Sequence, residues 1–105
     1  MLAKCCISIV SFLLAIGSFA GESVDLHSEG VKAFKAKKYD EALQSFEKDL
    51  KHNPNNVAAY FNLGLSYNAQ KEYGKAIWAF EKVLKITPNN SEAIENIEHN
   101  YLELD

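Results

Sequence analysis

The sequence predicts an all-α protein, an α-solenoid of stacked antiparallel helix pairs. The main observation is an internal repeat: residues 57–90 align with residues 23–56 at an offset of 34, and twelve aligned positions are identical. Within each copy, apolar residues recur at spacings of three and four, as on one face of a helix. Each copy ends in Pro-Asn-Asn, which stops a helix and suits a turn. Two copies of one helix–turn–helix unit are therefore expected.

The first copy predicts helices over residues 24–37 and 41–52, with Ser23 and Asp40 as their N-caps. Gly30 lies inside the first helix, where glycine costs up to about 1 kcal/mol relative to alanine. Because Gly64 repeats it, we expect this glycine to let the paired helix approach closely. The inward face of the second helix is expected to hold Ala42, Leu43, Phe46 and Leu50.

The second copy predicts helices over residues 57–70 and 75–86, and residues 92–104 predict a fifth helix after Asn90 and Ser91. The inward positions of the second copy are Tyr60, Leu63, Gly64, Tyr67, Ala76, Ile77, Phe80, Val83 and Leu84.

In the fifth helix, Ile94, Ile97 and Tyr101 keep the register of the inward positions. Terminal repeats usually present a polar outer face, and the residues expected there are Glu95, Glu98, His99, Asn100, Glu103 and Asp105. Residues 91–105 are therefore predicted to be a capping helix. The alternative is a truncated third repeat at the front of a longer protein.

The first twenty residues have the layout of a secretory signal peptide. A short positive start precedes an apolar run over residues 5–17, and small residues at Ser18 and Ala20 suit a cleavage site. The run is shorter than the roughly 20 residues that span a bilayer. We predict an exported chain, periplasmic or secreted, that meets a membrane only through this segment. An uncleaved N-terminal anchor is the alternative. Both cysteines, Cys5 and Cys6, would leave with the segment.

The remaining composition argues against several function classes. The net charge is −3 and all 11 basic residues are lysines, which disfavours nucleic-acid binding. No glycine-rich phosphate loop, G-x-S-x-G or HExxH motif is found. Glu95 and His99 are one helical turn apart, but two ligands are too few for zinc. We predict no catalytic residue, no cofactor, no metal and no small-molecule substrate, and therefore no enzyme.

The second copy resembles the tetratricopeptide repeat (TPR) family. The family signature W-xx-L-G-xx-Y, A-xxx-F and P is met by Tyr60, Leu63, Gly64, Tyr67, Ala76, Phe80 and Pro88. The first copy keeps Gly30, Ala42, Phe46 and Pro54 but has Leu26, Glu29 and Ala33 at the other positions. The layout of signal segment, two repeats and a helix beginning SEAIENIE is also similar to BatE-type aerotolerance proteins.

The resemblance implies a binding groove on a concave face lined by the first helix of each repeat. The implied positions are Val24, His27, Val31, Phe34, Lys35, Ala58, Phe61, Asn62, Leu65, Asn68, Ala69, Glu92, Glu95, Asn96, His99 and Leu102. Four of them form an apolar strip, Val31, Phe34, Phe61 and Leu65. The strip is bordered by the acids Glu92 and Glu95, which suits an extended or helical peptide with a basic residue. The alternative is that some apolar members are core, Phe34 first, because Ala33 is too small to fill the tyrosine position.

Two further inferences concern partners. Of the five clamp positions with which some TPR domains grip chaperone carboxylates, only Asn62 is kept, so docking of that kind is not expected. Trp78 aligns with Gln44, an exposed position, and indicates either a second interface with self-association or a side chain folded over Ala79. The predicted function is an exported protein-interaction adaptor. The first alternative is the N-terminal part of a larger envelope assembly or stress protein, and the less favoured one is a small metal-binding protein or enzyme.

Overall fold

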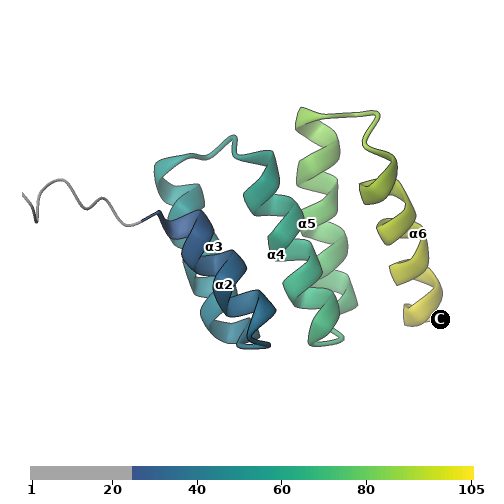
Figure 1. Cartoon of the computed structure of the whole chain (residues 1–105). Coiled ribbons are helices and arrows are strands. Elements are labelled where there is room, and N and C mark those ends of the chain that lie inside the picture. The colour runs from purple at the N-terminus through teal and green to yellow at the C-terminus, as the bar shows by residue number, and fades with distance from the viewer. Residues whose placement is uncertain (1–24) are drawn as a thin grey trace, which may run out of the picture.

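The computed structural model describes residues 25–105, and every regular element among them is a helix. The helices are α2 (Leu26–Lys35), α3 (Tyr39–His52), α4 (Val57–Ala69), α5 (Tyr73–Ile86) and α6 (Ser91–Leu104). Each helix packs against the next along the chain, so that α2 pairs with α3 and α4 with α5, and α6 stands beside α5 (Figure 1). The all-α solenoid expected from the sequence is confirmed.

At the start of three helices, the side chain of the N-cap residue accepts a hydrogen bond from the helix backbone. Asn56 and Asn90 accept a hydrogen bond from the backbone N–H three residues on, and Asp25 accepts from those of His27 and Ser28. Such a cap satisfies donors that have no partner inside the helix. Since α2 begins at Leu26, the predicted start at residue 24 was wrong, and Ser23 lies outside the described residues.

The predicted cap of α3 was also wrong. The helix begins at Tyr39, and the preceding Lys38 makes no capping hydrogen bond with its side chain. Asp40 instead lies in the first turn, where its Oδ1 accepts from Nε2 of Gln70 at 2.6 Å. This bond joins the tight turn of one repeat to that of the next.

Those two tight turns have the same backbone conformation. Lys37 and Lys71, which align in the repeat, have φ of 62° and 61°. In each turn the following N–H donates back across the helix end, from Lys38 to the carbonyl of Ala33 and from Glu72 to that of Tyr67, both at 2.9 Å. This left-handed ending closes a helix within a few residues, and it holds each pair antiparallel.

The core is built on a repeated contact between glycine and phenylalanine. A Cβ added to Gly30 would lie 2.5 Å from Phe46, and one added to Gly64 would lie 2.7 Å from Phe80. The expected reason for the two glycines is therefore confirmed, because any side chain would displace a fully buried ring. Two clusters surround these rings, and they share members between neighbouring repeats: Ala42, Leu43, Phe46, Leu63 and Ala79 in the first, and Ala76, Phe80, Val83 and Ala93 in the second.

The orientation of α6 corrects three positions of the predicted capping helix, whereas Ile97 packs against the core as expected. Ala93 and Asn100 are fully buried, whereas Ile94 is 39% exposed and Tyr101 53% exposed. Asn100 was expected on the outer face, and Ile94 and Tyr101 on the inner one. The helix turns its Ala93–Asn100 stripe toward α5. The stripe with Ile94 and Tyr101 is the one that aligns with the stripe of α4 covered by α5, and these two side chains remain partly exposed.

Candidate functional site

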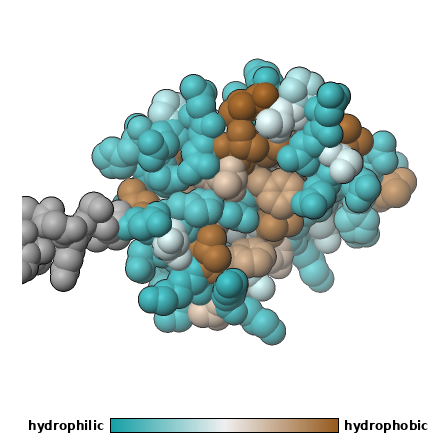
Figure 2. All heavy atoms as spheres, turned by 45° about the horizontal axis from the view of Figure 1, so that its top comes forward, coloured by the Kyte–Doolittle hydropathy of each residue, from teal (hydrophilic) through white to brown (hydrophobic). Residues whose placement is uncertain are grey.

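The surface of α2, α4 and α6, here called the groove face, carries the predicted apolar strip. All four members of that strip are half-buried, so each has one side in the core and one side on the surface: Val31, Phe34, Phe61 and Leu65. Viewed from the side of the turns after α3 and α5, hydrophobic side chains gather in the middle of the molecule within a hydrophilic border (Figure 2). The structure thus brings apolar surface together at solvent.

The two phenylalanines of the strip are held by edge-on aromatic contacts. Phe34 meets Tyr39 with ring centroids 5.5 Å apart, and Phe61 meets Phe80 at the same distance. Phe34 also packs against the cluster around Phe46, as does Ala33. Phe34 is therefore partly a core residue, the alternative expected from the small Ala33. Because both rings are fixed from beneath, the strip is a preformed surface.

Polar pairs join the three helices of the groove face. Nδ2 of Asn62 lies 3.5 Å from Nε2 of His27, and Nδ2 of Asn68 donates to Oδ1 of Asn96 at 3.4 Å. The Oδ1 atom of Asn68 is buried and has no protein partner among the described residues. These pairs fix the spacing between neighbouring repeats, and the sequence alignment by itself did not indicate them.

The charged members of the predicted site lie at the two ends of the groove face. Lys35 on α2 is exposed, as are Glu92, Glu95 and His99 on α6. Ala58, Ala69 and Leu102 are exposed as well, and Val24 lies outside the described residues. Nε2 of His99 is 3.8 Å from Glu103 and not paired with Glu95. Within residues 25–105, no three His, Cys, Asp or Glu side chains are grouped to hold a metal.

A model of the tetratricopeptide repeat family matches residues 28–91, more than half of the sequence. The chain belongs to the tetratricopeptide repeat family. Among solved structures, a mutant of MamA, a TPR protein, superposes with a TM-score of 0.73 at 25% identity, over 83% of this chain and 48% of that one. The chain thus spans about half the length of that structure. A search of curated protein sequences finds no match. The likeness to BatE-type proteins stays a prediction.

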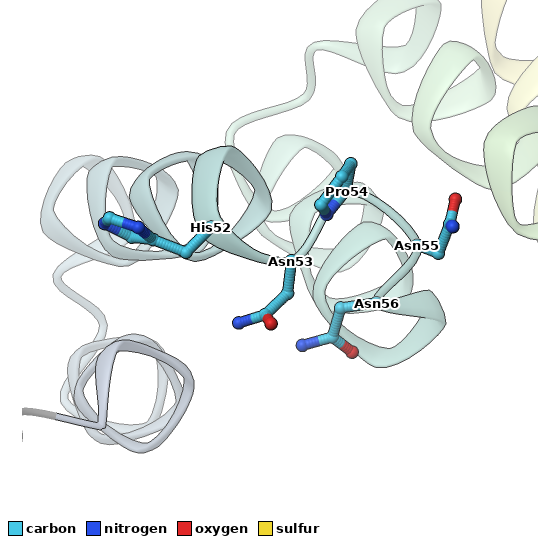
Figure 3. Close-up of a pocket in the computed structure, with 5 residues that line it drawn as sticks. All are labelled: His52, Asn53, Pro54, Asn55 and Asn56. Carbon is cyan, nitrogen blue, oxygen red and sulfur yellow. The ribbon is translucent and has the colours of Figure 1, made fainter.

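A hollow at the turn between the two TPR units is a structural feature. It is lined by His52, Asn53, Pro54, Asn55 and Asn56, and the amides of Asn53 and Asn56 lie on the same side of the turn (Figure 3). Both amides donate to the carboxylate of Asp49, at 3.1 and 2.6 Å. Asp49 is only 6% exposed, so these hydrogen bonds compensate its burial. The side-chain amides of Asn53 and Asn56 are thus already used by the turn.

A second hollow, here called the outer hollow, lies on the other side of the TPR pair, between α3 and α5 above α4. It is lined by Glu47, Leu50, Lys51, Tyr60, Leu63, Tyr67 and Trp78. Trp78 stands edge-on against Tyr60, with ring centroids 6.2 Å apart, and stays 48% exposed. Sequence reasoning found Trp78 and missed the hollow, because the register between α3 and α5 is not visible in one repeat.

The hydroxyl of Tyr67 forms the polar edge of the outer hollow. It lies 3.5 Å from Oε1 of Glu47. Burial, and then the negative charge of Glu47, raise the pKa of Tyr67 above its ordinary value. The tyrosine therefore stays a neutral donor that faces a carboxylate.

A search of the described helices for one long and apolar enough to cross a membrane finds no candidate.

Proposed function

We propose that this TPR chain is an exported protein-interaction adaptor that holds a peptide segment of a partner protein along the groove face. Membership of a family of repeat modules, with a solved TPR neighbour, supports a role in protein–protein interaction. The observation that carries the groove is the half-buried apolar strip of α2 and α4, fixed from beneath by the contact of Phe61 with Phe80. A preformed apolar surface loses little entropy when a ligand binds.

The groove face also indicates the chemistry of the ligand. Apolar anchors of the peptide would meet Phe61 and Leu65, which are half-buried. Glu92 and Glu95 are exposed at the α6 end, so a lysine or arginine of the peptide is expected there. The proposed ligand is thus a segment with apolar anchors and one basic end.

Affinity capture from the native envelope fraction tests this proposal, with residues 21–105 as bait. Phe61→Glu places a charge in the strip, and Glu92→Lys with Glu95→Lys reverses the acidic end without touching the core. Glu81→Lys, at an exposed position of α5, is the matched control. A partner held by wild type and the control and lost by both groove variants supports the proposal. A partner held equally by all four forms refutes the groove, and circular dichroism shows whether Phe61→Glu has unfolded.

Export is tested separately through the mass of the native chain. A chain that begins at Gly21 is expected, because Ser18 and Ala20 suit a signal-peptidase site. A native chain that keeps Met1 would contradict cleavage and favour the anchor.

A further inference from the structure

Two apolar surfaces of the described chain lie outside the groove face. One is the outer hollow, with Trp78 as its exposed wall. The other is on α6, where Tyr101 is 53% exposed and Leu104 is 56% exposed. These two residues are three positions apart, so they are neighbours on the helix surface. A soluble chain rarely leaves large apolar side chains grouped at solvent without an interaction.

The two surfaces carry opposite charge. After Lys85 the sequence has no lysine or arginine and five acids, all of them exposed in α6 or at Asp105. The outer hollow is edged by one acid, Glu47, and by Lys51, and Nζ of Lys82 lies 5.6 Å from the ring centre of Trp78. The two lysines outnumber the acid at this surface. Neither lysine forms an ion pair with another described residue. Opposite charges around complementary apolar patches favour association.

The acids of α6 are placed to use these lysines. Glu98 and Asp105 lie three and four residues from Tyr101, so both flank its ring on the helix surface. In the preceding repeat the residue aligned with Glu98 is Gly64, on which Phe80 packs. A helix of the α5 type would bring an apolar ring against the charge of Glu98. The open face of α6 therefore suits a partner that offers a cation beside an apolar recess.

We propose that α6 of one copy of this chain docks into the outer hollow of a second copy, with Tyr101 and Leu104 against Trp78, and Glu98 and Asp105 beside Lys51 and Lys82. The hollow has a volume of ≈ 280 Å³, near the lower end of the roughly 300–1,000 Å³ found for ligand pockets. It therefore suits inserted side chains better than a whole ligand.

This contact is heterologous, because the donor helix and the receiving hollow are different surfaces. After pairing, the copy that donates α6 keeps a free hollow and the copy that receives it keeps a free α6, so association continues beyond dimers. A single docked helix buries less accessible surface than a stable interface does, which is about 1,200–2,000 Å². The association is therefore weak and concentration-dependent, and it weakens with salt.

Two substitutions separate the surfaces without touching the core. Trp78→Gln introduces the residue that the first repeat has at the same position, Gln44. Tyr101→Gln changes a side chain that is 53% exposed. Sedimentation velocity of the purified chain from about 10 μM to about 1 mM spans the expected weak range. Wild type is expected to gain mass with concentration, and each variant alone to remain a monomer.

Mixing the two variants gives the sharpest result. Trp78→Gln keeps an intact α6 and Tyr101→Gln keeps an intact hollow, so an equimolar mixture is expected to form dimers and nothing larger. Trp78 is the chain's single tryptophan, so its emission reports the hollow directly and is expected to shift to the blue as wild type associates.

Three results would overturn the proposal. One is a monomeric wild type at the highest concentration. Another is association that survives Trp78→Gln, which would mean that α6 pairs with α6 or that another segment drives assembly. The third is a mixture of the two variants that stays monomeric while wild type associates.

Discussion

Helices α4 and α6 occupy the same place in the repeat, yet one is covered and the other is open. In α4, Leu63 is 1% exposed and Gly64 lies beneath the ring of Phe80. The aligned residues of α6 are Ile97, which is half-buried, and Glu98, which is exposed. The difference comes from α5, which packs on this stripe of α4 (Figure 1).

The repeat register predicts which residues of a helix can pack inward. Whether they are buried depends on the helices that pack beside it. Both helices bury the small residue at the third position, Ala59 and Ala93, against the preceding pair. Only α4 also buries the stripe that faces its own partner helix. The register alone therefore describes α4, which lies between described helices on both sides, better than α6.

The largest difference is expected for truncation of the aligned core residues. Leu63→Ala should lower the free energy of unfolding by about 2–5 kcal/mol, because a fully buried side chain leaves a cavity. Ile97→Ala should cost less than half as much, since its side chain already meets solvent. Urea unfolding followed by circular dichroism measures both. Equal losses would mean that the stripe of α6 is covered in solution.

A smaller difference is expected at the next position. Gly64→Ala gains helix propensity of about 1 kcal/mol, but its methyl group would overlap Phe80, and overpacking costs about 1–3 kcal/mol. We expect a net loss of up to about 2 kcal/mol, measured by urea unfolding. Glu98→Ala, at the aligned and exposed position of α6, should change the free energy of unfolding by less than about 0.5 kcal/mol. If Gly64→Ala were stabilising, the close approach of Phe80 would not limit the packing.

Much of the fold could be predicted because the residues of a contact in the first repeat recur at the aligned positions of the second. The positions of Gly30 and Phe46 recur at Gly64 and Phe80, so a pattern in sequence corresponds to one contact in space. The caps were less predictable, because Asp25 and Ser23 are both good capping residues and the choice depends on where the helix first packs. The positions of Ile94, Asn100 and Tyr101 on α6 were mispredicted because the repeat register assumes a covering helix.

The candidate site could also be predicted only in part. The strip on α2 and α4 follows from helix periodicity, so Phe61 and Leu65 could be placed on one face. Periodicity could not show that Phe34 turns partly into the core, because that depends on the small Ala33 and on the ring of Tyr39. The outer hollow could not be predicted either, because the distance between α3 and α5 is set by side chains of α4.

The smallest effect concerns the tyrosines that align in α4 and α6. The pKa of Tyr67 is raised above 10.0 by burial and then by Glu47, so the folded state favours the neutral hydroxyl. Its contribution to stability is therefore fully present below the unfolded pKa and is lost as the pH rises through the folded pKa. Between about pH 8 and pH 11, around the ordinary tyrosine pKa, the urea midpoint of wild type should fall more than that of Tyr67→Phe. Tyr101→Phe is the matched control, since this ring is 53% exposed, and it should follow wild type. If Tyr67→Phe also followed wild type, the covered and open helices would not differ at this position.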